Sequence, residues 1–356
     1  MKKGFLFISF VCLFTLVKAQ LAPKYSNEFL AVGVGARSAG MGNSVVASVS
    51  DVTSGYWNPA CLIDIKDNIQ ISLMHNEQFA GISKNDYGAV GFKLNDQSVL
   101  AFSIIRNGVD DIPNTLNMMN NGQIDYSLIT NFSAVDYAFM GSYARKTKIE
   151  GLSLGVNVKV IRRVIGDFAN AWGFGIDAGA KYKYKNWMFG AMLRDVTSTF
   201  NVWSFTFTDA QKQILTATQN QLPSNTLELT LPKLTIGAAY KWKLLNNRFS
   251  IMPEVNFDYT NDGQRNVLVS NKYFNLDPRL GLELGYSNIV FLRGGMFNFQ
   301  KELQIDGNSK VTFLPTIGIG LKLNNLAIDY ALANVGSVGS LPYSNIISAR
   351  LSINRK

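Results

Sequence analysis

The sequence LSLGVNVKVI at residues 152–161 decides the fold, because every second residue from Leu152 to Val160 is apolar. Ser153, Gly155, Asn157 and Lys159 occupy the alternate positions. Alternation with a period of two predicts a β-strand with one apolar and one polar face. The same alternation recurs at residues 172–184, 234–243 and 317–323, and helical periodicity is nearly absent after residue 69. The sequence therefore predicts an all-β protein.

Outward from this segment, the region from Ile69 to the C-terminus divides into alternating segments of about ten residues, the length of a transmembrane β-strand. Fourteen segments are predicted, and an up-and-down barrel with both ends on one side requires an even number. Tight turns alternate with longer connections, which is typical of the periplasmic turns and external loops of an outer-membrane barrel. The predicted strand centres are residues 73, 90, 102, 139, 156, 178, 190, 238, 254, 282, 293, 318, 329 and 349. The tight turns fall at 95–97, 146–151, 185–186, 246–247, 287–288 and 324–325, and the longer connections near 77–86, 107–133, 164–171, 196–231, 260–277, 300–310 and 334–345.

The two faces of the predicted strands fit a barrel surrounded by outer-membrane lipid. Such a barrel turns its apolar face to lipid and its polar face to the lumen, with aromatic residues at the interfaces. A soluble β-sandwich is the competing architecture, but its outward face would carry charge rather than Val, Leu and Trp. The predicted aromatic girdle is Tyr143, Tyr182, Tyr184, Trp187, Tyr240, Trp242 and Tyr286. The predicted lumen charges, which either fill the interior or line a transport path, include Lys181, Lys183, Lys241, Lys243, Glu254, Asp258, Glu283, Arg293, Lys322, Asp329 and Arg350.

The first 19 residues have the composition of a cleaved secretory signal peptide. Lys2 and Lys3 precede an apolar run from Phe5 to Val17, and small residues before Gln20 suit a signal peptidase. The run is too short to span a bilayer as a helix. We therefore expect export to the outer membrane of a Gram-negative bacterium.

Composition excludes several functional classes. The chain of 356 residues has 47% hydrophobic and 17% charged residues, one His and two Cys. Cys12 leaves with the signal peptide and Cys61 remains alone, so we expect no disulfide framework. A single His leaves too few groups for a metal site or a catalytic triad, and we expect no cofactor. Removal of three signal-peptide lysines lowers the net charge from +9 to 9 − 3 = +6. The remaining positive charge is spread through short turns rather than clustered on one face, which argues against a nucleic-acid partner.

The mature N-terminal segment, residues 20–68, precedes the first predicted strand and is the candidate hatch. A barrel of fourteen strands has a lumen too wide for its own side chains to fill, so a plug is expected. The predicted domain division is residues 1–19 as signal, 20–68 as hatch and 69–356 as barrel. Pro253 lies within a predicted strand and removes a ladder donor, so we expect a bulge or a gap in the wall there.

Other motifs carry little chemistry. The sequence GVGARS at residues 33–38 lacks the third glycine of a dinucleotide fingerprint and any surrounding βαβ unit. His75 is interpreted as an interfacial side chain, and Asp110 and Asp111 as a solvated loop face rather than a hydrolytic pair. Apolar residues at loop tips suggest either a partner surface or a cover for the barrel mouth. The candidates for this role are Met118, Met119, Trp203, Phe205 and Phe207.

The N-terminal segment resembles the opening of the PorV/PorQ family, within the wider group of FadL-like outer-membrane barrels. The resemblance rests on Gly-Ala-Arg, Met-Gly and Trp-Asn-Pro-Ala at this spacing, and it extends from about residue 25 to the end. It implies a non-enzymatic subunit of the type IX secretion system, whereas FadL itself takes up long-chain fatty acids through a hatch and a side opening. The matching residues are Gly35, Ala36, Arg37, Met41, Gly42, Trp57, Asn58, Pro59 and Ala60.

Two classes of function follow. The first is a non-enzymatic adaptor that presents external loops to other outer-membrane or surface proteins of an export machine, or of the complex that inserts outer-membrane proteins. The second is a FadL-like transporter of hydrophobic small molecules, which predicts an apolar pocket between hatch and wall and a bound lipid or fatty acid. An enzyme is not expected, because no nucleophile has a base nearby in the sequence.

Overall fold

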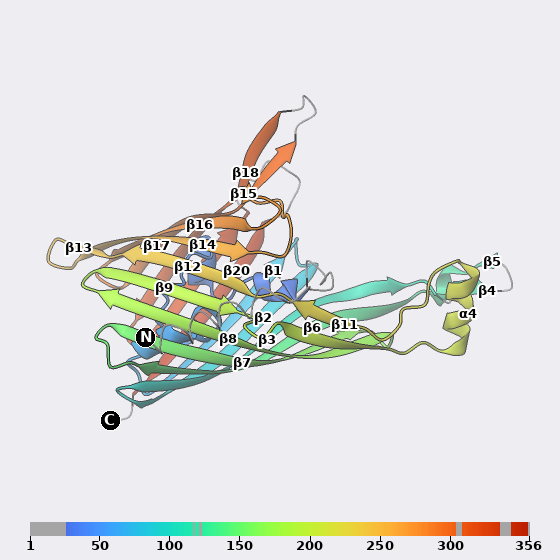
Figure 1. The fold of residues 1–356 in the computed structure, drawn as a ribbon, viewed down its shortest axis with the longest axis horizontal. Helices are drawn as coiled ribbons and strands as arrows, with labels where there is room; N and C mark the ends of the chain where they lie inside the picture. The colour runs from blue at the N-terminus through green and yellow to red at the C-terminus, as the bar shows by residue number, and fades with distance from the viewer. Residues whose placement is uncertain (1–25, 117, 121–122, 304–307, 335–342, 355–356) are drawn as a thin grey trace, which may run out of the picture.

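The computed structural model describes residues 26–116, 118–120, 123–303, 308–334 and 343–354, and the predicted signal peptide lies outside these ranges. The described chain forms a transmembrane β-barrel of fourteen antiparallel strands (Figure 1). The barrel closes where β1 pairs with β20, with Ile69 opposite Ile353. All fourteen predicted strand centres fall inside observed strands. The wall consists of β1 Ile69–Gln78, β2 Ser83–Asn95, β3 Ser98–Asn114, β6 Thr130–Lys146, β7 Leu152–Ile165, β8 Ala169–Tyr184, β9 Trp187–Arg194 continued by β10 Thr199–Phe205, β11 Leu227–Thr230 continued by β12 Lys233–Tyr240 and β13 Trp242–Leu244, β14 Phe249–Thr260, β16 Asn275–Tyr286, β17 Val290–Leu303, β18 Ser309–Leu323, β19 Leu326–Ala333 and β20 Ser344–Ile353.

The predicted alternation of short and long connections is partly wrong. The connections at residues 79–82 and 166–168 are as short as the tight turns. Strands such as β3 and β6, each 17 residues long, extend beyond the roughly 9–11 residues needed to cross a bilayer. Segments that read as loops are therefore often strands that continue past the membrane. We call the two ends of the barrel the tight-turn end and the long-loop end.

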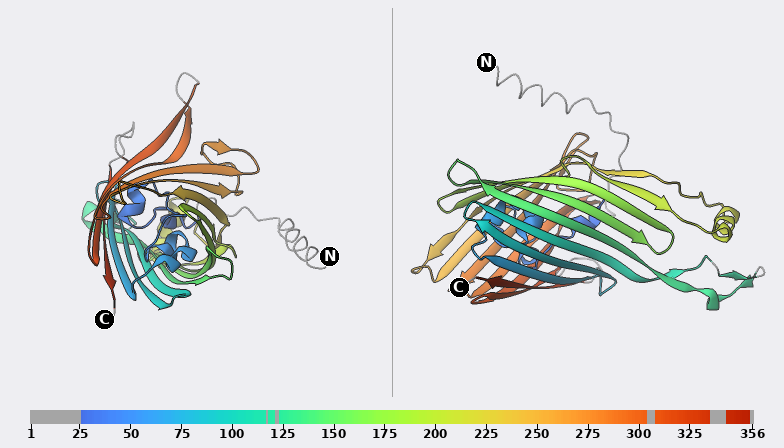
Figure 2. Two further views of the ribbon diagram at one scale, coloured as in Figure 1. Left: turned by 90° about the vertical axis from the view of Figure 1, so that its left-hand side faces the viewer. Right: turned by 90° about the horizontal axis from the view of Figure 1, so that it is seen from below.

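Among the segments that extend beyond the barrel body at the long-loop end, two are seen apart from one another in Figure 2 (right). One is the β3–β6 hairpin, which carries the short strands β4 Met119–Asn120 and β5 Gln123–Ile124 and the turn η3 Tyr126–Leu128. The other carries the helix α4 Asp209–Ala217, which begins with a capping box formed by Thr208 and Gln211. A further short strand, β15 Val269–Ser270, pairs with β16.

The two faces of the wall differ as the sequence predicts. In β7 the side chains of Leu154, Val156 and Val158 are exposed, whereas Asn157 and Lys159 are 0% and 2% exposed. Because the apolar side chains face outward and the polar ones inward, the outer surface is apolar and suited to lipid. Apart from the half-buried Tyr240, the predicted girdle residues are exposed on this outer surface. No helix within the described ranges is long and apolar enough to cross a membrane.

The N-terminal segment lies inside the barrel (Figure 2, left). Its short helices are η1 Glu28–Ala31, α2 Ala36–Gly40, α3 Ser54–Trp57 and η2 Pro59–Asp64. Together with lumen-facing wall residues, they form the main hydrophobic core of the protein. We call residues 26–68 the hatch.

Pro253 does not produce the predicted bulge. Its pairing with β16 is continuous, with Pro253 opposite Leu282. On the opposite edge of β14, the pairing with β12 ends at Ala239 opposite Glu254. The pairing with β13 begins at Trp242 opposite Ile251, in the same register. The proline therefore leaves a local gap in hydrogen bonding, because it has no amide N–H to donate, without shifting the strands.

The larger irregularity of the wall lies between β9 and β10. Ala178 pairs with Leu193 and Phe174 with Phe200, so residues 175–177 of β8 face residues 194–199. The inserted segment is held inward because Lys159 Nζ lies 2.5 Å from Asp195 Oδ1, and the Asp195 amide donates to Asp177 Oδ1 at 2.9 Å. A buried ammonium shared by two carboxylates thus fixes this bulge to the lumen side of the wall.

Candidate functional site

The first half of the hatch is attached to four strands of the wall by the residues of the family-like motif. The amide of Gly35 donates to Met74 Sδ at 2.9 Å, and the amide of Ala36 donates to Ser348 Oγ at 3.1 Å. The amide of Gly42 donates to Thr316 Oγ1 at 3.0 Å, and a Cβ at this glycine would lie 2.7 Å from the Met296 nitrogen. Met41 is fully buried beside these contacts. The motif residues therefore act together as an attachment to β1, β17, β18 and β20.

A chain of ion pairs connects Arg37 of the hatch with the wall. Arg37 Nε donates to Glu283 Oε2 at 2.9 Å, and Arg293 Nε donates to the same oxygen at 2.8 Å. Arg293 also donates to Asp329 Oδ1 at 2.7 Å. The predicted lumen charges on β16, β17 and β19 thus form one network, and Arg37 extends it into the hatch.

A second ion pair joins Asp51 of the hatch to Arg350 of β20. Burial by itself raises the pKa of the Asp51 carboxyl, but Arg350, the Thr53 hydroxyl and Arg37 together hold this pKa below its ordinary value. Asp51 is therefore an anion at neutral pH, and its ion pair with Arg350 is charged.

The sequence Trp57-Asn58-Pro59-Ala60 attaches the second half of the hatch. Trp57 Nε1 donates to the Val34 carbonyl at 2.9 Å, which ties this half to the first. Asn58 Nδ2 donates to the carbonyls of Val46 and Ala180 at 3.0 Å each, and its Oδ1 caps η2 by accepting from the Ala60 amide. Pro59 follows at the first helical position, where a missing N–H has no cost.

Glycine on β7 lets the hatch approach the wall. A Cβ at Gly155 would overlap the backbone of Pro59 and Ala60, so only glycine fits there without movement of one of the two. Ser153 Oγ, two residues earlier on the same face, donates to the Ala60 carbonyl at 3.0 Å. Cys61 is fully buried next to this contact, and burial raises the pKa of its thiol to about 12. The thiol is therefore protonated and unreactive while the hatch is seated.

A cavity of about 200 Å³, which we call the outer pocket, lies between the hatch and the wall toward the long-loop end. Its lining joins the first part of the hatch to β1, β17, β18, β19 and β20. Apolar side chains provide most of the lining surface, with a few polar groups such as Asn43 and Asn76. The apolar lining consists of Ala31, Val32, Ala39, Met74, Phe79, Phe297, Leu314, Ala333 and Ile346.

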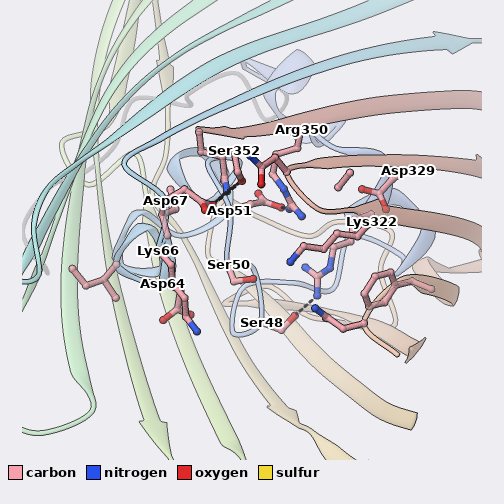
Figure 3. A pocket seen from close by; sticks show the side chains of 18 of the residues that line it. Ser48, Ser50, Asp51, Asp64, Lys66, Asp67, Lys322, Asp329, Arg350 and Ser352 are labelled. Carbon is pink, nitrogen blue, oxygen red and sulfur yellow. Dashed lines mark hydrogen bonds and ion pairs between the residues drawn. The ribbon is translucent and has the colours of Figure 1, made fainter. Parts of the chain in front are cut away.

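A larger cavity of about 760 Å³, which we call the inner chamber, lies on the other side of the hatch (Figure 3). Residues of the tight turns, including Asn95, Asn288 and Asn324, line it, so it faces the tight-turn end. Figure 3 shows Arg350 of the wall beside Asp51 of the hatch, with Lys322 and Asp64 lining the same cavity. The hatch therefore separates a mainly apolar pocket from a charged chamber.

The candidate loop residues do not form one site. Trp203 and Phe205 belong to β10, so their assignment to a loop is wrong, and Trp203 is buried with Ala169 and Ala171. Trp203 Nε1 donates to Glu228 Oε2 at 2.7 Å, which fixes the ring in place. Phe207 is half-buried and stacks on Phe168. Met118 is half-buried near the tip of the β3–β6 projection, and the side chain of Met119 lies outside the described part of the chain.

Sequence reasoning missed the lining of the outer pocket. Phe79 and Leu314 come from segments far apart in sequence, and no local pattern distinguishes them from other apolar strand residues. Within the described ranges, no group of three His, Cys, Asp or Glu side chains is placed to hold a metal ion.

Fourteen strands around an N-terminal hatch define a FadL-type outer-membrane barrel fold. No protein-family model and no curated protein matches the sequence.

Among solved structures, the chain is similar to the CymD monoaromatic hydrocarbon channel, with a TM-score of 0.60 and 13% identity over 91% of this chain and 98% of that one. The Pseudomonas putida toluene transporter TodX has a TM-score of 0.58 and 15% identity over 91% and 99% of the two chains. A Pseudomonas aeruginosa FadL homologue has a TM-score of 0.51 and 12% identity over 90% and 98%. At these identities the similarity establishes the fold, and membership of the PorV/PorQ family stays a prediction.

Proposed function

We propose that this protein moves small hydrophobic molecules across the outer membrane. The observation that carries this proposal is the outer pocket, an apolar cavity of about 200 Å³ between hatch and wall. An apolar cavity of about 150 Å³ takes up benzene in another protein, so this volume suits one monoaromatic ring or a ligand segment of that size. The similar structures are described as a monoaromatic hydrocarbon channel and a toluene transporter rather than as enzymes, which supports the same class of function.

The proposed path begins at the long-loop end. A hydrophobic solute leaves water at the outer pocket because its burial against Met74, Phe297 and Leu314 is favourable. The seated hatch lies between this pocket and the inner chamber, so onward passage requires the hatch to move or the wall to open. Gly35, which lines the pocket, and the neighbouring Ala36 each donate one backbone hydrogen bond to the wall, to Met74 and Ser348, and a modest rearrangement can exchange these two bonds.

A binding experiment tests the pocket. Toluene binding to the purified protein in detergent is measured by saturation-transfer NMR. The substitution Ala333→Leu adds bulk to the pocket lining, and we expect it to weaken toluene binding about fivefold or more. Ala349→Leu on the exposed face of the adjacent strand β20 is the matched control, with binding expected to stay within about twofold of wild type. Equal toluene binding by wild type and Ala333→Leu would contradict the proposal.

A second candidate function is an adaptor for export or assembly of surface proteins, as the PorV/PorQ resemblance implies. The two long-loop projections favour it, because the first carries Tyr126 with 72% of its surface exposed and the second carries the exposed α4. Exposed apolar groups at the tip of an anchored protein suit a protein partner. Affinity purification in mild detergent separates the two functions. Loss of co-purifying outer-membrane proteins after removal of residues 209–217 supports the adaptor, and a partner-free barrel with bound hydrophobic solute supports the transporter.

A further inference from the structure

The charges that line the inner chamber are unequal in number. Ten lining residues are Arg or Lys and six are Asp or Glu. The chamber is enclosed by the barrel wall and the hatch, whose low polarizability concentrates the field of these charges in the cavity. An excess of cations in such a cleft attracts anions from the adjoining solution.

The acidic groups of the chamber already have partners. Glu283 and Asp329 are paired with Arg293, and Asp51 with Arg350. Asp64 is paired with Lys181, and Asp96 with Lys93 at 2.7 Å. The Asp67 carboxylate accepts hydrogen bonds from Ser352, Gln70 and Asn354. Every carboxylate of the lining is therefore already hydrogen-bonded or ion-paired.

Several lysines of the lining are not paired. In the ranges that the structure describes, their side-chain ammonium groups make no ion pair or hydrogen bond. Lys241 and Lys322 are half-buried within the chamber, whereas the others are exposed near its mouth. Withdrawing an ammonium group from water without a charged partner is unfavourable. A bound anion would give Lys241 and Lys322 the partner that they lack, so this part of the chamber is suited to an anion. The unpaired lysines are Lys66, Lys146, Lys183, Lys241, Lys243 and Lys322.

We propose that the inner chamber is a binding site for a small polyanion, carrying phosphate or carboxylate groups, that enters from the tight-turn end. The volume of about 760 Å³ lies in the range of roughly 300–1,000 Å³ that small-molecule sites occupy. More than one anionic group is needed because Lys241 and Lys322 come from different strands of the wall, with further lysines around the mouth. The site lies across the hatch from the outer pocket and does not depend on the proposed passage of hydrophobic molecules.

Isothermal titration calorimetry of the full-length protein in detergent tests this inference, with tripolyphosphate and citrate as probes. We expect saturable binding of at least one probe at low salt, and weaker binding at high salt because the interaction is between charges. The double substitution Lys241→Gln with Lys322→Gln is expected to weaken binding at least about tenfold, since two charge-assisted contacts are lost. A preference for tripolyphosphate identifies phosphate as the ligand chemistry, and a preference for citrate identifies carboxylate.

The matched control is Lys148→Gln with Lys185→Gln, which removes the same charge from exposed tight-turn residues outside the chamber lining. Binding by this variant should stay within about twofold of wild type. Heat-modifiable migration on SDS gels verifies that each variant is a folded barrel. The inference is overturned if neither probe binds saturably to the wild type, or if the control pair weakens binding as much as the chamber pair.

Discussion

At the scale of single residues, Glu283 links the hatch directly to two strands of the wall. Its Oε2 accepts from Arg37 of the hatch and from Arg293 of the wall. The alternation of the strands placed Glu283, Arg293 and Asp329 on the lumen face correctly. The ion pair between Arg37 and Glu283 could not be predicted from one sequence, because these two residues are 246 positions apart and only the closed barrel brings them together.

Replacement of Glu283 should loosen the hatch. In Glu283→Gln, the half-buried Arg37 loses its carboxylate partner and the buried Arg293 keeps only Asp329. Breaking a buried ion pair in this way typically costs about 3 to 5 kcal/mol. Hydrogen exchange of peptides that cover residues 36–44, followed by mass spectrometry, should become at least about 100-fold faster at the most protected amides. Glu77→Gln on the exposed face of β1 is the control and should leave this exchange unchanged. Equal protection in Glu283→Gln and wild type would show that the ion pairs do not hold the hatch.

At the scale of elements, the hatch fits the wall because small residues alternate with polar ones on the lumen face. Gly155 accepts the backbone of η2, while Ser153 beside it donates to the Ala60 carbonyl. The sequence predicted the polar and glycine-rich face and the position of the hatch in the chain. It did not predict which strand each hatch helix would contact, because short helices held by backbone hydrogen bonds leave no periodic pattern.

The contact at Gly155 can be tested through Cys61, the single cysteine that remains after the predicted signal cleavage. In Gly155→Ala, the new methyl group collides with Pro59 and Ala60, so η2 must shift and expose the thiol. We expect maleimide labelling of Cys61 in the folded barrel to become at least about tenfold faster than in wild type. Gly141→Ala on β6 is the control, because its Cβ would meet Phe102 at an ordinary contact distance of 3.8 Å. Unchanged labelling in Gly155→Ala would mean that the hatch does not require the close approach.

Prediction of elements failed most clearly at β10. The stretch around Trp203 and Phe205 was interpreted as loop, yet it continues β9 after the bulge at residues 195–198. Beyond the membrane both faces of a strand can be wet or covered by protein, so the alternation of apolar and polar residues is no longer imposed by lipid. The bulge itself depends on Lys159, Asp177 and Asp195 meeting in the lumen, which is a tertiary effect.

At the scale of the whole molecule, the hatch divides the lumen into two compartments of different chemistry. The outer pocket is small and mainly apolar, and the inner chamber is larger and basic. The number of strands and the direction of their faces followed from the sequence, and a plug formed by residues 20–68 stays a prediction. An apolar pocket between hatch and wall was predicted for the transporter class, but the lining residues and the inner chamber were not, because both cavities draw their residues from distant strands as well as from the hatch.

The most direct test of the account is uptake of radiolabelled toluene by intact cells of a host that lacks barrels of this fold. Cells with the wild-type protein in the outer membrane should take up toluene about fivefold faster than cells without it. Ala333→Leu should bring uptake close to the level of cells without the protein, while Ala349→Leu, expressed at the same level, should keep the wild-type rate. Equal uptake with and without the wild-type barrel, or no difference between the two leucine variants, would contradict the proposal that the outer pocket lies on a path for hydrophobic molecules.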